Sequence, residues 1–176
     1  MRIVSGSLKG RRIQAPTNLP VRPTTDFAKE SLFNVLNNHV DFDDLNVLDL
    51  FAGIGGISYE FASRGASVLS VEINPKCADF IKQTAEHLHI KNLTVMRTDV
   101  FAYIAKTRQT FDLIFADPPY ELPTIDLLPS LIFEYKLLNP NGLFVLEHSE
   151  KHNYSGVPQF LELRKYGKVH FSFFRL

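Results

Sequence analysis

Asp117, Pro118, Pro119 and Tyr120 place a carboxylate, two rigid prolines and an aromatic ring directly after an apolar stretch of the chain. Each proline fixes its φ angle and removes a backbone donor, so we expect the Pro118 carbonyl to remain a fixed acceptor beside the Asp117 carboxylate. Two acceptors aimed at one point can hold the amino group of a nucleobase while the Tyr120 ring stacks on the base. A simple turn would explain the prolines but not the acid and the aromatic residue that flank them.

A second stretch suited to binding chemistry is a glycine-rich segment that follows an earlier apolar run. Gly53 and Gly55 suit a backbone that turns sharply and lets a ligand approach without a Cβ in the way. The segment matches the dinucleotide fingerprint poorly, because the third glycine position is occupied by Ser58. Asp49, inside the apolar run, would repel a phosphate but suits an ammonium group, although it could also cap nearby backbone N–H groups.

Two further acids follow the next two apolar runs. Glu72 is placed to accept two hydrogen bonds from the hydroxyls of a ribose. Asp99 is placed to accept from an adenine amino group, and it is about equally suited to cap the helix that follows it. An amino acid, a ribose diol and an adenine together describe S-adenosylmethionine better than NAD or ATP.

Short apolar runs that alternate with stretches of helical spacing position these residues. This alternation is typical of an α/β fold with a mostly parallel sheet and right-handed crossovers. We expect strands at 47–51, 67–73, 93–96, 113–116 and 142–147, and helices at 56–63, 75–88, 101–107 and 125–138. Residues 160–176 leave no room for a helix, which predicts a C-terminal antiparallel hairpin. The prediction is a Rossmann-like sheet of seven strands, as in class I methyltransferases.

The first forty residues differ in character from the rest. Residues 1–14 alternate loosely around two glycines, which predicts a β-hairpin, and a helix is expected to begin at Thr25 or Asp26 after three prolines. We expect residues 1–40 to form a basic extension and residues 41–176 to form the methyltransferase domain, together in one compact unit.

The charge is sorted along the chain, although 19 basic and 19 acidic residues balance overall. Residues 1–25 hold five basic residues and no acid, which suggests that this arm meets a polyanion. We expect Lys9, Arg11, Arg12 and Arg22 to contact RNA phosphates, although a solvated basic hairpin would look the same. Basic residues of the C-terminal hairpin could extend this surface.

Several classes of protein are disfavoured by composition. A single cysteine, Cys77, can form neither an internal disulfide nor a cysteine-based zinc site, which favours a reducing compartment. The six histidines lack the spacing of metal ligands, so no metal is expected. No apolar stretch approaches the length of a membrane span or a secretion signal, so we expect a cytoplasmic protein, with a monomer as the default.

The motifs taken together resemble one known family. They comprise the D-x-F-x-G-x-G loop from Asp49, the DPPY sequence, the Met1–Gly6 start with its Lys-Gly-Arg-Arg, and the segments at 22–26 and 63–66. This combination, which covers nearly the whole chain, resembles the RsmD family of bacterial 16S ribosomal RNA guanine-N2 methyltransferases. Phe27 and Lys29 depart from it, since arginines are usual there.

The resemblance implies roles for individual residues. Asp49, Phe51, Ala52, Gly53 and Gly55 would line the methionine and ribose of the cofactor. Glu72 would hold the ribose, and Asp99 and Val100 would hold the adenine. Asp117, Pro118, Pro119 and Tyr120 would bind a guanine turned out of its stack, and no metal is required. The substrate would be 16S rRNA, which the family suggests is modified in a partly assembled small subunit.

Other activities remain open on the sequence alone. An adenine-N6 or cytosine-N4 DNA methyltransferase also uses DPPY, but it would be expected to carry an added region that reads DNA. A non-catalytic RNA-binding module would need only the basic arm and would leave Asp49, Glu72 and DPPY unexplained. A methyltransferase of protein glutamine would be expected to have Asn in place of Asp117.

Overall fold

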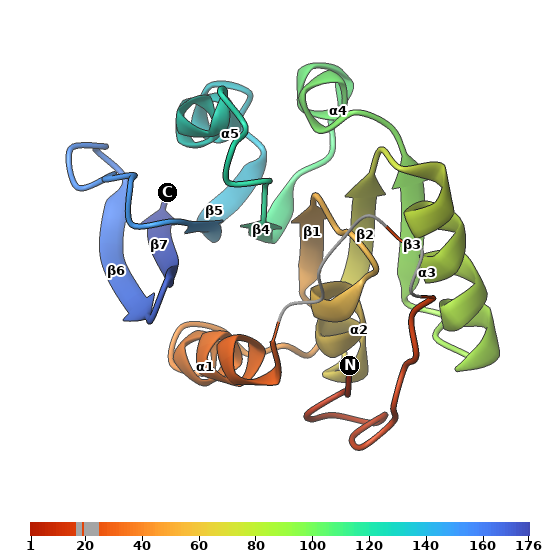
Figure 1. The fold of residues 1–176 in the computed structure, drawn as a ribbon. Coiled ribbons are helices and arrows are strands. Elements are labelled where there is room, and N and C mark those ends of the chain that lie inside the picture. The colour runs from red at the N-terminus through yellow and green to blue at the C-terminus, as the bar shows by residue number, and fades with distance from the viewer. Residues whose placement is uncertain (17–18, 20–24) are drawn as a thin grey trace.

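The computed structural model describes residues 1–16, 19 and 25–176. The expectation about Arg22 therefore lies outside the described residues. Within them, five α-helices and seven strands form one layered arrangement (Figure 1). The helices are α1 (Asp26–Leu36), α2 (Gly56–Ser63), α3 (Pro75–His87), α4 (Val100–Lys106) and α5 (Leu128–Glu134). The strands are β1 (Asn46–Leu50), β2 (Ser67–Glu72), β3 (Leu93–Arg97), β4 (Phe111–Ala116), β5 (Leu138–His148), β6 (Phe160–Tyr166) and β7 (Val169–Arg175).

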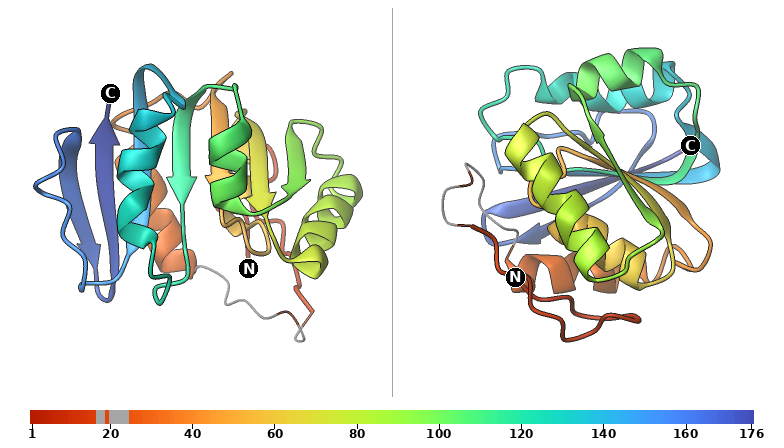
Figure 2. Two further views of the ribbon diagram at one scale, coloured as in Figure 1. Left: turned by 90° about the horizontal axis from the view of Figure 1, so that it is seen from above. Right: turned by 90° about the vertical axis from the view of Figure 1, so that its right-hand side faces the viewer.

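The described strands form a single sheet in the order β3-β2-β1-β4-β5-β7-β6. The first five strands run parallel, whereas β7 is antiparallel to both β5 and β6. The arrows in Figure 2 show the reversal at β7. The predicted Rossmann-like fold with a C-terminal antiparallel hairpin is confirmed.

Two apolar clusters cover the two faces of the sheet. Helices α1, α2 and α3 pack on one face and α4 and α5 on the other (Figure 2). Successive residues of a strand point to opposite faces, so Val47 joins the first cluster and Leu48 the second. Both side chains are fully buried, which explains why the central strands are continuously apolar.

Two expected elements differ in detail. The helix expected at 125–138 is a short 3₁₀ turn followed by α5, which ends at Glu134 because Lys136 adopts a φ of 54° and β5 begins at Leu138. The expected hairpin of residues 1–14 is present as an antiparallel turn, but its only bridge pair is Arg2 with Arg12. The N-terminal arm, residues 1–14, is nevertheless closed by backbone hydrogen bonds, among them Ile3 to the Arg11 carbonyl at 2.9 Å and Ile13 to the Met1 carbonyl at 3.0 Å.

The arm is fixed to α2 by buried polar contacts. The Glu60 carboxylate is fully buried and accepts from the amides of Val4 and Ser5 at 2.8 and 2.9 Å. Arg64 donates to the same carboxylate, and the Lys29 ammonium lies 3.8 Å from it. Lys29 is only 2% exposed, so it joins the arm, α1 and α2 rather than facing solvent.

Gly6 provides a test of this attachment. Its φ is +80°, and an added Cβ would lie 1.9 Å from the Ser63 carbonyl oxygen. Gly10 has a similar φ of +85° but has open space around its Cβ position. We expect Gly10→Ala to cost only the roughly 1–2 kcal/mol of a left-handed residue. Gly6→Ala should lower the thermal unfolding midpoint further and make the arm sensitive to protease, and equal midpoints for the two variants would contradict this attachment.

Candidate active site at the carboxyl edge of the sheet

The strand register aligns four residues at the carboxyl ends of neighbouring strands, three of which the sequence analysis had singled out. Leu50 pairs with Val71 and with Ala116, and Ala116 pairs with Leu146. The residues that follow these positions are therefore neighbours along the edge where the parallel strands end. In spatial order they are Glu72 at the end of β2, Phe51 directly after β1, Asp117 directly after β4, and Glu147 near the end of β5.

The DPPY corner is hydrogen-bonded to the last residue of β1, directly before the glycine turn. The Asp117 amide donates to the Leu50 carbonyl at 3.3 Å, and the Ala52 amide donates to the Val71 carbonyl at 3.1 Å. Each of these bonds joins a loop residue to the end of the neighbouring strand. The two predicted motifs therefore share one edge and are separated by a single strand spacing, about 4.8 Å.

The two glycines of the turn serve different purposes. Gly53 has a φ of +55°, and the nearest atom to an added Cβ is the Phe51 carbonyl oxygen at 4.0 Å, so its surface is open to a ligand. Gly55 has a φ of +81°, and an added Cβ would lie 2.8 Å from the Tyr59 ring. Gly55 is thus required by the packing of α2 as well as by its backbone conformation. Phe51 also adopts a positive φ, 60°, directly after β1.

Asp49 is buried beneath this turn. It is 1% exposed, and its carboxylate accepts a short hydrogen bond from the Ser58 hydroxyl, which lies 2.6 Å from the Ser70 hydroxyl. A hydrogen bond from the Ser58 backbone amide also acts on this carboxylate, which agrees with the alternative that Asp49 caps a nearby backbone N–H group. Burial raises the pKa of Asp49 to about 7, although the Ser58 bond lowers it. The group can therefore change charge near neutral pH.

The two acids expected to hold ribose and adenine lie farther along the edge. Glu72 is 7% exposed and accepts from the amides of Gly53 and Asn74, both at 2.7 Å, so it braces the glycine turn. Asp99 caps α4 by accepting from Ala102 at 2.9 Å, as one of its two interpretations anticipated. Val100, the next residue, is buried, whereas Asp99 itself is exposed.

Ile73 was not singled out by the sequence. It follows Glu72 directly and is 61% exposed, which is unusual for a large apolar side chain. Its place after the acid of β2 was visible in the sequence, but its exposure was not. It offers an apolar surface beside the polar groups of the edge.

The DPPY corner keeps its polar groups available. Pro118 is buried, and none of the described residues donates to its carbonyl, whereas the Pro119 carbonyl accepts from Leu122 at 2.9 Å. Burial raises the pKa of Asp117 to about 7. The Tyr120 hydroxyl donates to Glu147 at 3.0 Å, which ties the ring to the end of β5.

Glu147 is the polar residue of this edge that the sequence analysis missed. It is 5% exposed, and burial together with the nearby Asp117 raises its pKa to about 8. The available signal was an acid at the end of an apolar run, the same pattern that singled out Glu72. The sequence pattern places Glu147 only at the end of the strand expected at 142–147.

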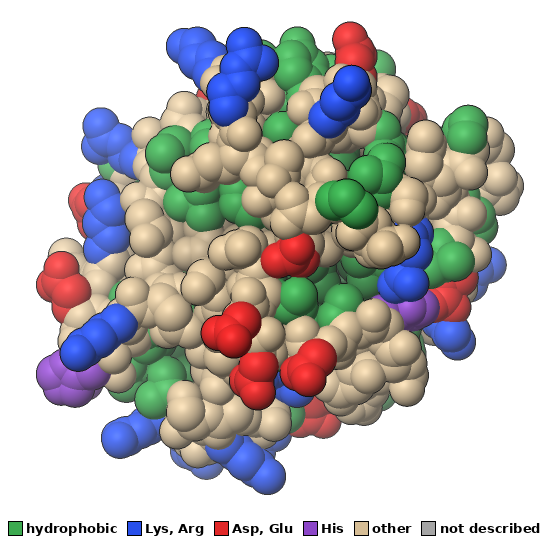
Figure 3. Space-filling view, turned by 180° about the vertical axis from the view of Figure 1, so that it is seen from behind, with side chains coloured by type: hydrophobic (Ala, Val, Ile, Leu, Met, Phe, Trp, Pro, Cys, Tyr) green, Lys and Arg blue, Asp and Glu red, His purple; other side chains and the backbone are tan. Residues whose placement is uncertain are grey.

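The predicted basic contacts are exposed where the structure describes them. Lys9, Arg11 and Arg12 lie on the surface, and among the described residues no carboxylate pairs with them. Arg2, in contrast, pairs with Glu30 at 3.1 Å. On the side of the molecule opposite to that of Figure 1, acidic side chains lie near the middle and most Lys and Arg side chains lie toward the margins (Figure 3).

Other chemistry finds little support in the described part of the chain. No group of three His, Cys, Asp or Glu side chains there could hold a metal ion, and no helix there is long and apolar enough to cross a membrane. Cys77 is buried on α3, where burial raises the pKa of its thiol. It is packed as a small apolar residue.

The sheet order and the motifs at its carboxyl edge define a Rossmann-like methyltransferase. A solved structure of a provisionally named methylase from Haemophilus influenzae has 25% identity and a TM-score of 0.80, and the alignment covers 99% of this chain and 97% of that one. The model of the family described as Conserved hypothetical protein 95 matches residues 1–175. The chain belongs to this family, the RsmD family.

Two relatives illustrate the family. YlbH of Bacillus subtilis, provisionally named an rRNA methyltransferase, is 39% identical over 86% of this chain and 84% of its own length. Ribosomal RNA small subunit methyltransferase D of Buchnera aphidicola subsp. Baizongia pistaciae is 30% identical over 99% of this chain and 91% of its own length.

Proposed function

We propose that this protein transfers a methyl group from S-adenosylmethionine to the exocyclic N2 amino group of a guanine in small-subunit (16S) ribosomal RNA. The hydrogen bond that ties the DPPY corner to the end of β1 carries the proposal, because it sets a ligand-accessible turn beside acceptors for an amino group. The relatives named for methylation of small-subunit ribosomal RNA support the choice of RNA.

The residues at the glycine turn suit this cofactor. The open surface at Gly53 admits a ligand, and the buried Asp49 beneath it can balance an ammonium group. Glu72 retains acceptor capacity for ribose hydroxyls beyond its two backbone bonds, and Ile73 offers an apolar face for a flat base. Bound there, S-adenosylmethionine supplies an electrophilic methyl group on a sulfonium. Phe51, Ala52, Asp99 and Val100 would complete the site.

The DPPY corner would hold the base. The Asp117 carboxylate and the Pro118 carbonyl accept the two amino hydrogens of the guanine, and the Tyr120 ring stacks on the base. The amino nitrogen forms the new N–C bond as the C–S bond breaks, and the electron pair of that bond stays on sulfur. The methylated nitrogen then releases a proton to Asp117, directly or through water. Alignment of the reacting atoms can supply roughly 7–11 kcal/mol of the barrier reduction.

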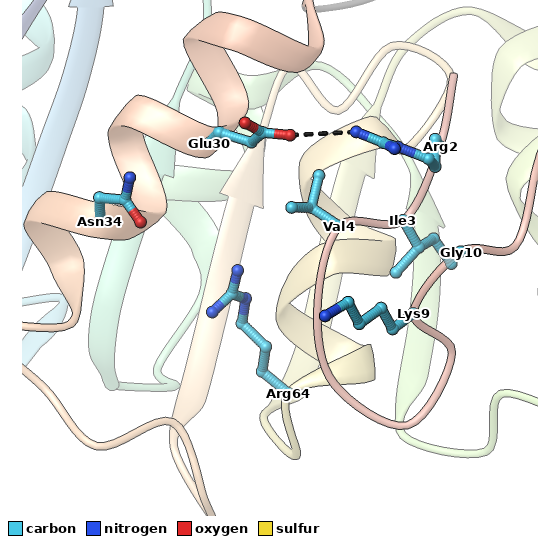
Figure 4. A pocket seen from close by; sticks show the side chains of 8 residues that line it. All are labelled: Arg2, Ile3, Val4, Lys9, Gly10, Glu30, Asn34 and Arg64. Carbon is cyan, nitrogen blue, oxygen red and sulfur yellow. Dashed lines mark hydrogen bonds and ion pairs between the residues drawn. The ribbon is translucent and has the colours of Figure 1, made fainter.

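The N-terminal arm would hold the RNA backbone. A pocket of about 330 Å³ lies between the arm, α1 and α2, and the side chains of Lys9 and Arg64 point into it (Figure 4). Arg64 is already paired with Glu60, so Lys9 and the exposed Arg11 and Arg12 are the residues that would offer positive charge to phosphates without reading their sequence. We include Arg22 in this surface on the strength of the sequence alone. Residues 1–40 would thus serve as the RNA-binding extension of the 41–176 domain.

The arm makes a testable contribution to RNA affinity. Replacing both Arg11 and Arg12 with Ala should weaken binding of small-subunit rRNA and reduce the slope of log affinity against log salt by about 1–2. Binding measured by fluorescence anisotropy at several salt concentrations tests this. The double variant K106A/R108A, which changes two exposed basic residues at the end of α4, is the matched control, and an unchanged slope for the arm variant would contradict RNA contact there.

The activity itself is tested by supplying labelled cofactor to three substrates. These are small-subunit particles from cells that lack the protein, free small-subunit rRNA, and duplex DNA. We expect N2-methylguanosine, identified by mass spectrometry, in the rRNA and most of it in the particles. N6-methyladenine or N4-methylcytosine in the DNA would favour the alternative activity. We further propose that the protein acts in the cytoplasm as a monomer.

A further inference from the structure

Two acidic side chains meet at the carboxyl edge without a cation between them. Asp117 follows β4 and Glu147 lies near the end of β5, one position beyond the pair Ala116 and Leu146. No described Lys or Arg forms an ion pair with either carboxylate. Acidic groups brought together in this way repel each other when both are charged.

Glu147 has an oxygen with no partner. The side chain is 5% exposed, and its Oε1 accepts from the Tyr120 hydroxyl at 3.0 Å. Its Oε2 is buried and finds no hydrogen-bond donor in the described part of the chain. Leaving a buried acceptor unpaired destabilises a protein, so an arrangement of this kind calls for an explanation. A ligand that brings a donor to this oxygen provides one.

The remaining acceptors of the site do not distinguish among bases. Asp117 and the Pro118 carbonyl can accept the amino hydrogens of guanine, adenine or cytosine equally well. These bases differ at the ring nitrogens next to the amino group. In guanine N1 carries a hydrogen and N3 carries a lone pair, whereas in adenine and cytosine the single adjacent ring nitrogen carries a lone pair.

We propose that Glu147 contacts the target base, accepts the N1 hydrogen of guanine, and thereby excludes bases that present a lone pair at that position. This inference rests on the proposed guanine-N2 activity. Guanine places N1–H beside its amino group, so it can satisfy Asp117 and Glu147 together. In a base with a lone pair at that position, the ring nitrogen and the Glu147 carboxylate oxygen would both be acceptors and would repel each other. The Glu147 oxygen would then remain unpaired.

The test compares two substrates that differ at this hydrogen. An rRNA fragment is prepared with guanosine, or with 2-aminopurine riboside, at the methylated nucleotide. 2-Aminopurine keeps the 2-amino group but has no hydrogen on N1. We expect the wild-type protein to prefer guanosine by about 100-fold or more in kcat/KM. Glu147→Gln should narrow this preference to below about 10-fold, because an amide can either accept or donate.

Controls separate this inference from the proposed function and from a folding defect. Glu150→Gln removes an exposed acid three residues further on and should leave the preference unchanged. If the wild-type protein does not methylate guanine at N2, the proposed function fails. If it does, and Glu147→Gln keeps the wild-type preference even with lower overall activity, Glu147 does not select the base.

A measurement on the wild-type protein needs no variant. Asp117 and the Tyr120 hydroxyl are the titratable groups that act on Glu147. Selection requires the Glu147 carboxylate, whose pKa is raised to about 8, so the preference for guanosine should rise from pH 6 and level only near pH 9. Effects common to both substrates cancel in the ratio. A preference that is constant from pH 6 to 9 would overturn the inference.

Discussion

Replacing Asp117 with Ala should reduce methyl transfer to guanine N2 by roughly 10²–10⁴-fold while leaving cofactor binding within about twofold of wild type. The reduction follows from the position of the carboxylate, which lies at the end of β4 beside the glycine turn. Alanine removes both an acceptor for the amino group and the group that takes the proton. Single-turnover transfer to small-subunit particles, with calorimetry of cofactor binding, measures both quantities.

Two comparisons make this result specific. Glu121→Gln changes an exposed acid four residues away and should leave transfer unchanged. Asp117→Asn keeps the shape of the side chain and one acceptor oxygen but cannot take a proton. Comparing its rate of methyl transfer with that of Asp117→Ala therefore separates the contribution of positioning the amino group from that of accepting the proton. Asp117→Ala with wild-type transfer and normal cofactor binding would exclude the proposed role.

The second large effect is expected at Asp49. Asp49→Asn should weaken binding of S-adenosylmethionine by roughly 10²–10³-fold, because removing one member of a buried ion pair costs about 3–5 kcal/mol. The side chain is 1% exposed, so water cannot replace the lost charge. Asp79→Asn, an exposed change on α3, is the matched control. An unchanged dissociation constant for Asp49→Asn would show that the ammonium group binds elsewhere.

The same carboxylate predicts the pH dependence of cofactor binding. The ammonium group binds the charged form of Asp49, whose pKa is raised to about 7. Affinity should therefore rise as the pH increases from 5.5 to 7.5, by up to tenfold per unit below the pKa. It should fall again above about pH 8, where an α-amino group loses its proton. Asp49→Asn should lose the dependence below pH 7.

The parallel sheet could be predicted because its signals are local and repeated. Strands buried on both faces must be continuously apolar, so runs such as 47–51 and 113–116 can be recognised from the sequence alone. The end of α5 could not be predicted in this way. It depends on Lys136 adopting a left-handed conformation, for which lysine has no preference, and on β5 starting earlier than its apolar run.

Parts of the site that depend on residue types with few structural roles, such as glycine and proline, could be predicted from the sequence. Parts that depend on contacts between residues far apart in the chain could not. Glycines and prolines at strand ends indicate an unusual backbone conformation. The proximity of the two motifs follows because the carboxyl ends of parallel strands lie at the same edge of the sheet. The burial of Lys29 against Glu60 depends on residues 31 positions apart, which no local pattern shows. The unpaired oxygen of Glu147 likewise results from packing across β4 and β5.

The hydrogen bond between the Asp117 amide and the Leu50 carbonyl has a mechanical consequence. Because of this bond, the distance between the glycine turn, which would bind the methyl donor, and the DPPY corner, which would bind the base, is set by the spacing between β1 and β4. Thermal motion of the surrounding loops can change how often the substrates are held, but it cannot stretch that distance without opening the sheet. Insertions in those loops should therefore change how tightly the substrates bind much more than they change the rate of methyl transfer once both substrates are bound.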